Sequence, residues 1–158
     1  MRTTFYMIAS ALCATIAASA AHAEANKVVI GDIDDMSGVY ADIMGPGGVE
    51  AAKMAIADFG GSVLGNKIEL LVTDHQNKPD LSAEKFREWA DRDGVTMVLG
   101  GSNTGVSIAM TTIAREKKTP FFAIGAAGAS LTGKDCRPTP CTMHTIPQRS
   151  VTGPPPPF

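Results

Sequence analysis

Short apolar runs alternate with longer amphipathic stretches through most of this chain. Four runs rich in aliphatic and β-branched residues have the length of buried strands: residues 27–33, 67–73, 95–99 and 120–124. Between them, three segments carry apolar residues at helical spacing: residues 45–59, 79–92 and 103–117. The residues expected on the apolar sides of the first two helices are Ala52, Ala55, Ile56 and Phe59, then Phe86, Trp89 and Ala90.

This alternation predicts successive βαβ units. Such units form a parallel sheet with helices on both faces, and right-handed crossovers make it a doubly wound α/β layer. In these sheets the loops after the carboxyl ends of the strands form a crevice in which function collects. The four loops expected there are residues 34–40, 74–77, 101–104 and 125–128.

The two ends of the chain depart from this pattern. Residues 5–18 are almost wholly apolar, and Ala21-His22-Ala23 has the small-x-small form that signal peptidase accepts. The apolar stretch is shorter than the roughly 20 residues that a spanning helix needs. We therefore expect residues 1–23 to be a cleaved secretory signal and residues 24–135 to form one α/β lobe.

Residues 136–158 form a Pro-rich, irregular tail with seven of the ten prolines of the chain. It could be a polyproline II ligand for a recognition domain. It could instead follow a reading-frame change, because codons for residues 150–155 can be read one base earlier as Leu-Gly-Asn-Gly-Thr-Ala. Cys136 and Cys141 lie at the start of this tail, and in an exported chain they could form a disulfide.

Charge narrows the range of partners. The formal net charge is −2, becomes −3 once Arg2 is removed with the signal, and is spread without long runs. A weakly acidic chain without a basic stripe is not expected to bind nucleic acid, or to insert into a membrane after signal cleavage. We expect a monomer.

Acidic and histidine residues near the strand ends do not match a metal site. A calcium loop beginning at Asp32 would need glycine and glutamate where Ser37 and Ile43 stand. We expect Asp34 and Asp35 to be turn residues with Asx hydrogen bonds. Asp74-His75 has no second His or Cys nearby to complete a site, so His75 is expected to be solvated or hydrogen-bonded. No metal is expected.

Two partial catalytic motifs are also incomplete. Residues 105–109 approach the Gly-x-Ser-x-Gly nucleophile elbow, but Ser107 falls inside a predicted helix and Ala109 replaces the last glycine. Residues 128–134 match half of a phosphate loop, but Asp135 stands where Ser or Thr would hold magnesium. We expect no enzymatic activity, no catalytic residue and no cofactor.

What remains is a cradle of main-chain groups and hydroxyls for a small molecule. Residues 102–104 begin the third helix, where free N–H groups and the positive end of the helix dipole can hold a carboxylate. Residues 126–128 bring main chain close to a ligand and can accept hydrogen bonds from an ammonium group. Amino acids carry both groups. Plain helix capping by Ser102 and Thr104 explains those two residues equally well.

A family resemblance extends over about residues 26–135. It is carried by Ile30-Gly31-Asp32, Met36-Ser37-Gly38, Gly47 to Ala52, Leu71 to Pro79, and Val98 to Ser102, in the same order and spacing. Together they resemble the first lobe of the periplasmic branched-chain amino-acid-binding proteins, the solute receptors of ABC importers. The resemblance implies the N-terminal lobe of a type I periplasmic-binding fold, a periplasmic location, ABC permease partners, and a small amino acid or amide as ligand. It assigns ligand contacts to Ser102, Asn103, Thr104, Ala126 and Ala127, and a place in the cleft wall to Tyr40.

Gly128 departs from the resemblance, because many leucine-type members have a hydroxyl residue at that position. The second lobe of the family is missing from this sequence, so we expect a truncated copy that binds weakly or not at all, since affinity in such proteins depends on two lobes closing on the solute. The alternative function is an exported α/β sensor or partner-binding domain whose Pro-rich tail docks a partner.

Overall fold

A five-stranded sheet with the order β2-β3-β1-β4-β5 organises residues 27–135, the part of the chain that the computed structural model describes. The strands are β1 (Val28–Asp34), β2 (Ser62–Val63), β3 (Asn66–Asp74), β4 (Val95–Gly100) and β5 (Phe121–Ala123). β1 is parallel to β3 and β4, and β4 is parallel to β5. The doubly wound α/β prediction is confirmed, and all four expected strands are present within two residues of their expected ends.

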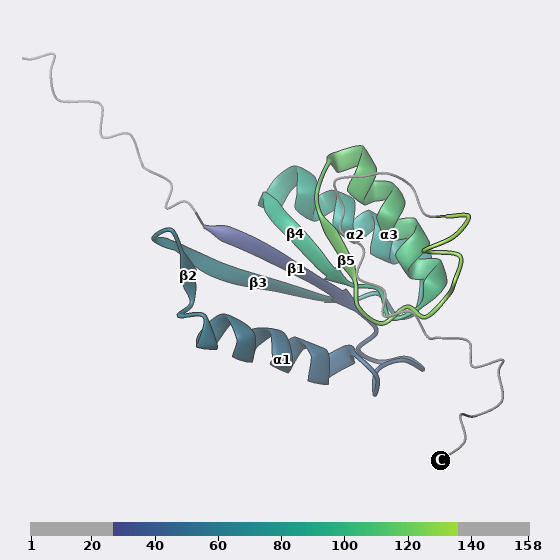
Figure 1. Ribbon diagram of the computed structural model, residues 1–158, viewed down its shortest axis with the longest axis horizontal. Coiled ribbons are helices and arrows are strands. Elements are labelled where there is room, and N and C mark those ends of the chain that lie inside the picture. Colours follow the sequence, from purple (N-terminus) through teal and green to yellow (C-terminus); the bar gives the residue numbers. More distant parts are fainter. Residues whose placement is uncertain (1–26, 136–158) are drawn as a thin grey trace, which may run out of the picture.

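Helices cover both faces of the sheet (Figure 1). They are α1 (Gly45–Asp58), α2 (Pro79–Glu88) and α3 (Thr104–Lys117). α1 lies on one face by itself, whereas α2 and α3 pack against each other on the opposite face. This arrangement follows from the chain path, because the first crossover leads from β1 to β3 and the next two lead to β4 and β5 on the other side of β1.

The face under α2 and α3 holds the hydrophobic core. Alternate residues of a strand point to opposite faces, and Val29 and Ile33 of β1 point to this one. Phe86 of α2 and Phe121 of β5 meet there with ring centroids 6.2 Å apart. The other core members are Trp89, Val95, Val98, Val106, Met110, Ile113, Ala114 and Ala123. The predicted buried side of the second helix is thus confirmed for Phe86 and Trp89, and Ala90 packs against the cluster half-buried.

The α1 face is covered less completely. Within α1, only Gly45 and Val49 are buried. Of the apolar residues that the helical spacing singled out, Ala52 and Ile56 are half-buried, Ala55 is exposed, and Phe59 is 66% exposed. The spacing therefore predicted the helix correctly but not the depth at which its apolar side is buried, which depends on how much other structure lies around it.

The second predicted helix ends earlier than expected. α2 stops at Glu88 and continues as one wide π-helical turn, η1 (Trp89–Asp93), closed by Gly94 in the left-handed conformation with φ 63°. The indole of Trp89 lies directly over Gly31 of β1, where a Cβ atom would be only 2.8 Å from the ring. The glycine therefore allows the helix to approach the strand closely.

One hairpin was not anticipated. β2 pairs antiparallel with the start of β3, and the two-residue turn between them is Leu64-Gly65. Both turn residues have positive φ, 51° and 81°, as in a type I′ turn. A leucine in that conformation gives no sequence signal for such a turn, because Asn and Gly are the residues that favour it.

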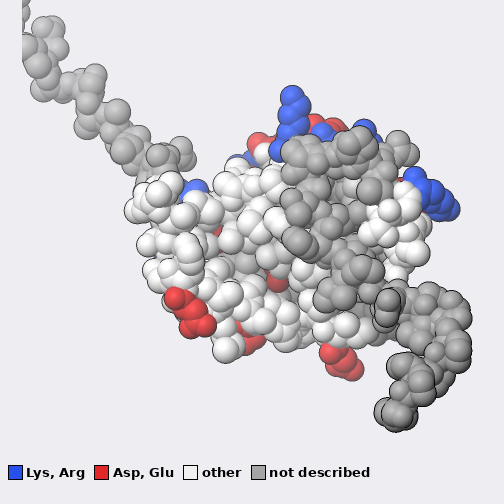
Figure 2. Space-filling view, viewed as in Figure 1, with Lys and Arg blue, Asp and Glu red and all other residues white. Residues whose placement is uncertain are grey.

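The predictions for residues 1–23 and 136–158 concern parts of the chain outside the described residues, including the Cys136–Cys141 pairing. Within residues 27–135, no helix is long and apolar enough to cross a membrane. Figure 2 shows most of the visible Lys and Arg along the edge where α2 and α3 lie, together with acidic residues, and further acidic residues on the α1 side.

Candidate functional site

The strand order reverses between β1 and β4, and the carboxyl ends of these strands lie at the lower right of the sheet in Figure 1. β3 lies on one side of β1, and β4 followed by β5 on the other. Such a switch point is where open α/β sheets form their ligand crevice, because the loops on either side of it diverge. The predicted site residues come from the loops that follow β1, β4 and β5 and, for Thr104, from the first position of α3. We call residues 35–44, 101–104 and 124–128 the rim.

Two glycines bring the loop after β4 against β1. Gly100 and Gly101 have φ values of 124° and 76°, in the region that side chains rarely adopt. A Cβ atom on Gly100 would lie 2.8 Å from the carbonyl carbon of Ile33, and closer still to its oxygen. The Gly101 N–H donates to the Ile33 carbonyl at 3.0 Å. These contacts place Ser102 over the end of β1.

The Ser102 hydroxyl is used inside the protein. It donates to the Asp34 carboxylate and accepts the Asp35 N–H at 3.2 Å, and the residue is 2% exposed. Ser102 thus joins two strands through its side chain. In this geometry its hydroxyl faces β1 and is occupied, so its contribution to a ligand site would be to hold the loop in place.

Asp35 shapes the loop that carries Tyr40. Its carboxylate accepts the Gly38 N–H at 2.8 Å and the Tyr40 N–H at 3.0 Å, which is the Asx type of bonding predicted for it. Asp34 differs from the prediction, since it is the last residue of β1 and its side chain accepts from Ser102 rather than from a turn. The Tyr40 side chain is half-buried beside this loop.

Asn103 caps α3. Its side-chain oxygen accepts the Val106 N–H at 2.9 Å, while its amide donates to the Asn77 side chain. The cap is therefore Asn103, whereas Ser102 and Thr104 were the capping residues weighed from the sequence. Thr104 is the first residue of α3 and half-buried, at the end of the helix where N–H groups lack helical partners and the dipole is positive.

The loop after β5 lies against the loop after β4. A Cβ atom on Gly125 would lie 3.0 Å from the Ser102 Cα and 2.9 Å from the Met44 side chain. A Cβ atom on Gly128 would overlap the Thr104 side chain, with the Thr104 Cβ only 2.9 Å away. The loops that the sequence assigned to the two ends of a ligand are thus in contact. Between these glycines, Ala126 is 5% exposed and Ala127 is exposed.

Asp74, at the end of β3, ties a fourth loop to the rim. Its carboxylate accepts the Ser37 hydroxyl at 2.5 Å, the Met36 N–H at 3.1 Å and the Gln76 N–H at 2.7 Å. Partial burial opposes ionisation, but these hydrogen bonds outweigh it and lower the pKa of Asp74. Asp74 is therefore an ionised anchor for residues 36–37.

His75 is buried and hydrogen-bonded. Its Nδ1 accepts the Asn77 N–H at 2.9 Å, so a neutral ring carries its proton on Nε2, which has no hydrogen-bond partner in the described structure. Burial lowers the pKa of His75, against the opposing effect of the Asp34, Asp35 and Asp74 charges. The ring is neutral near pH 7, and its hydrogen bond with the Asn77 N–H stabilises the loop after β3.

Asp32 and Asp34 are buried acidic residues that sequence reasoning did not recognise as a buried pair. Both are 0% exposed. Burial raises the pKa of Asp32 to about 7, and the nearby charge of Asp34 adds to the rise. Burial also raises the pKa of Asp34, although the Ser102 hydroxyl and the His75 charge act in the opposite direction. A loop prediction from polarity could not reveal this, because it treats aspartates near a strand end as exposed.

The metal, nucleophile-elbow and phosphate-loop motifs weighed from the sequence do not form sites in residues 27–135. These residues contain no group of three or more His, Cys, Asp or Glu side chains placed to hold a metal ion. Ser107 lies within α3, is buried, and donates to the Gly101 carbonyl at 2.9 Å, so it is not the exposed serine of a nucleophile elbow. Residues 129–135 form turns rather than the helix that a phosphate loop would need.

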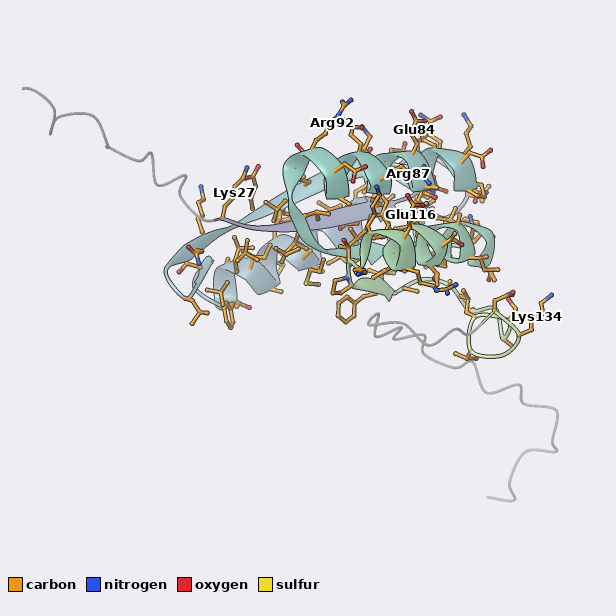
Figure 3. The ribbon with its side chains drawn as sticks, turned by 90° about the horizontal axis from the view of Figure 1, so that it is seen from above. Lys27, Glu84, Arg87, Arg92, Glu116 and Lys134 are labelled. Carbon is orange, nitrogen blue, oxygen red and sulfur yellow. The ribbon has the colours of Figure 1, made fainter. Side chains whose placement is uncertain are left out.

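Two surface hollows lie away from the rim. One, of about 230 Å³, lies between α3 and the segment after β5, and its lining residues are Ile108, Thr111, Thr112, Arg115, Leu131 and Asp135. The other, of about 280 Å³, lies on the outer surface of α2 and η1, with Glu84, Arg87, Glu88, Asp91 and Arg92 around it. Arg87, which lines this second hollow, forms an ion pair with Glu116 of α3, with 3.3 Å between Arg87 Nη2 and Glu116 Oε2. Figure 3 shows these two side chains facing each other. Neither hollow includes a predicted site residue.

Comparisons with known proteins identify solved structures that share this fold. A periplasmic binding protein from Burkholderia mallei is 51% identical, with a TM-score of 0.70 over 73% of this chain and 31% of that structure. A branched-chain amino acid ABC transporter periplasmic ligand-binding protein from Burkholderia xenovorans is 39% identical, with a TM-score of 0.67 over 70% of this chain and 30% of that structure. A solute-binding protein of an ABC transporter from Rhodopseudomonas palustris, in complex with 3,4-dihydroxybenzoic acid, is 27% identical, with a TM-score of 0.63 over 67% of this chain and 29% of that structure.

The chain thus spans about three tenths of the length of these structures. No curated protein sequence matches it. The family model described as periplasmic binding protein matches residues 27–155, which includes every strand and helix described above. The chain belongs to the periplasmic binding protein family.

Proposed function

We propose that this chain supplies a solute-binding lobe to an ABC importer in the periplasm, and that its rim receives the carboxylate of a small organic solute. Membership of the family supports the class of function. Two of the similar structures carry names that refer to ABC transport, one with branched-chain amino acids and one with 3,4-dihydroxybenzoic acid. Amino acids and hydroxybenzoic acids share a carboxylate, so that group defines the proposed ligand class. Binding without catalysis is part of the proposal.

The carboxylate would lie at the start of α3. The observation that carries the proposal is the contact between Gly128 and Thr104, which places main chain of the β5 loop beside the first turn of α3. Unpaired N–H groups and the positive end of a helix dipole favour an anion there, and the Thr104 hydroxyl is a further donor. Asn103 would hold the helix start in position through its cap, and Ser102 would hold the loop through Asp34.

The other end of the solute would meet the loop after β5 and the loop after β1. Main-chain carbonyl groups at Ala126 and Ala127 can accept hydrogen bonds from an ammonium group, if the solute is an amino acid. The half-buried Tyr40 would form part of the wall. Gly128 leaves room for Thr104 at a place where a hydroxyl side chain would overlap it.

Binding by residues 27–135 alone is expected to be weak. A rim touches a solute from one side, whereas tight sites bury most of the ligand surface. The permease partner, the monomeric state and the cleaved signal remain parts of this proposal.

Amide NMR is a suitable test because it detects weak binding. The full chain, labelled with ¹⁵N, is titrated with 3,4-dihydroxybenzoate, with leucine, and with 3,4-dihydroxybenzamide, which lacks the carboxylate. At least one of the two carboxylates should shift the backbone amide signals of Thr104, Gly105 and Ala127 in a saturable way. 3,4-Dihydroxybenzamide should not shift these signals.

A matched pair of variants locates the site. Thr104→Val removes the hydroxyl at the start of α3 and should weaken binding several-fold. Thr112→Val makes the same change at an exposed position in the middle of α3, where the hydroxyl bonds to the Ile108 carbonyl, and should leave binding unchanged. Equal effects of the two variants, or shifts confined to the α2 hollow, would rule out the rim as the site.

A further inference from the structure

Asp32 and Asp34 form a pair of carboxyl groups inside the protein, directly below the rim. They are two residues apart on β1, so their side chains point to the same face of the sheet, opposite the Trp89 side that Gly31 faces. Both side chains are 0% exposed. Three of their four oxygens, both of Asp32 and Oδ2 of Asp34, have no hydrogen-bond partner in the described structure. The fourth, Asp34 Oδ1, accepts from Ser102.

The surroundings of the pair offer no compensating cation. Within residues 27–135, neither carboxylate forms an ion pair with Lys or Arg. The sheet neighbours of Asp32 are Val72 on β3 and Leu99 on β4, and Asp74 is the neighbour of Asp34. The charge of His75 acts on Asp34, and two further acidic residues adjoin it, Asp35 in the chain and Asp74 in the sheet. The charged residues of α1 are Glu50, Lys53 and Asp58. Glu50 and Lys53 pair with each other at the surface, with side chains 64% and 58% exposed, and Asp58 is also exposed.

Two unpaired negative charges at these positions would be costly, because both side chains are 0% exposed and no donor among residues 27–135 reaches the three bare oxygens. A single proton changes this balance. A protonated Asp32 becomes an O–H donor toward Asp34, so that one bond satisfies an oxygen of each group, and only one charge stays buried. Asp34 is the better site for that charge, since its carboxylate also accepts the Ser102 hydroxyl.

We propose that Asp32 and Asp34 hold one proton between them, and that its release to solvent loosens the rim by placing a second negative charge beneath Ser102. The Ser102 side chain connects the pair directly to the rim. Asp34 accepts the Ser102 hydroxyl, and the same hydroxyl accepts the Asp35 N–H, so the pair supports the loops after β1 and β4 together. The lobe would thereby respond to the pH of its compartment without any bound solute.

The direction of the pH effect follows from proton counting. The folded chain retains a proton on Asp32 between the ordinary pKa of 3.8 and about 7, and the unfolded chain does not. The contribution of this proton to stability is therefore greatest at the acid end of this range and is lost as pH rises to about 7, over which it increases the unfolding constant by up to about tenfold per pH unit. His75 acts in the opposite sense, because its pKa is lowered and it adds stability as pH rises toward 6.5. A comparison with a variant that lacks only the Asp32 carboxyl separates the two.

Urea unfolding of the full chain between pH 4.5 and 8.0 provides the first test, with Trp89 fluorescence as the signal. Asp32→Asn should remove up to about a tenfold change in the unfolding constant per pH unit relative to the unmodified chain. Asp42→Asn, at an exposed position of the same loop region, is the matched control and should keep the unmodified pH profile. Identical profiles for all three proteins would overturn the proposal.

Carboxyl NMR provides a second test that requires no variant to fold. In the full chain labelled with ¹³C at the aspartate side-chain carboxyl, one signal should titrate near pH 7, and the amides of Asp35 and Ser102 should shift with the same midpoint. If every aspartate titrates below about pH 5, the shared proton does not exist. Neither test involves a solute, so a failed search for a ligand leaves the inference intact, and its own failure leaves the solute-binding proposal intact.

Discussion

The contact between Gly128 and Thr104 makes a quantitative prediction about the rim. In a Gly128→Ala variant, the new Cβ would overlap both Cγ2 and Oγ1 of Thr104 and lie 2.9 Å from its Cβ. Gly128 does not have positive φ, so alanine meets no backbone strain of its own at this position. Any loss of stability therefore reports the collision between the two loops.

The size of the effect can be bounded. Forcing an extra methyl group into a packed contact costs about 1–3 kcal/mol, because side chains and backbone must move apart. Against a total stability of about 5–15 kcal/mol for a single domain, this loss is measurable without preventing folding. With a urea m-value of about 1–3 kcal/mol per M, the midpoint should fall by roughly 1 M.

A double-mutant cycle assigns the loss to the predicted neighbour. Thr104→Ala removes the two overlapping atoms and leaves only the Cβ contact at 2.9 Å. In that background, Gly128→Ala should cost about 1 kcal/mol less than in the unmodified chain. Equilibrium urea unfolding is followed by fluorescence of Trp89, the one tryptophan of the sequence, which is 7% exposed in the folded chain.

Gly47→Ala is the matched control for the chemical change. Gly47 lies in the first turn of α1, and a Cβ there would meet nothing within 4 Å. The same substitution should raise stability by about 0.5–1 kcal/mol, because alanine loses less freedom in a helix than glycine. If Gly128→Ala also raises stability, or if its cost and that of Thr104→Ala simply add, the two loops are not in the contact described.

Three further changes test the core, the hairpin and the helix cap, each by the same urea unfolding. Phe86→Ala should lower the free energy of unfolding by about 3–5 kcal/mol, because removing a fully buried ring packed against Phe121 leaves a cavity. Phe86→Leu should cost less, and a small loss for both variants would contradict the core position of Phe86. Leu64→Asn should stabilise the chain by about 0.5–1 kcal/mol, because Leu64 is 96% exposed with φ 51° and asparagine tolerates that conformation. A loss of stability in this variant would contradict the type I′ turn. Asn103→Ala should cost about 1 kcal/mol by removing the acceptor of the Val106 N–H, whereas Asn103→Asp, which keeps an acceptor, should cost less.

Much of the fold could be predicted because helical and strand periodicities are local properties of the chain. Alternating runs predicted the ends of β1, β3, β4, β5, α1 and α3 to within one or two residues, and the parallel, doubly wound sheet followed from their order. The Asx bonding of Asp35 was also predictable, since its partners Gly38 and Tyr40 are only a few residues away. The β2 hairpin was missed because its turn begins with leucine, which carries none of the usual turn chemistry.

The candidate site was predictable in its loops but not in the use of each side chain. Rules for parallel sheets placed residues 101–104 and 125–128 at one edge, and the structure brings these loops into contact. They could not show that the Ser102 hydroxyl turns inward to Asp34, or that Asn103 is the cap. Those outcomes depend on neighbours that the local pattern does not contain.

Residue patterns along the chain were sufficient for the kind of fold, the order of its elements and the edge where function is expected, because each follows from spacing within one element and its direct successor. Contacts between distant segments set the rest: how deeply α1 is buried, and how Asp32 and Asp34 come to lie inside the protein. Asp34 meets Ser102 across 68 positions of sequence. Such a pairing exists only once β1 and β4 lie side by side, and the burial that raises the pKa of Asp32 is a property of the packed sheet rather than of any short stretch.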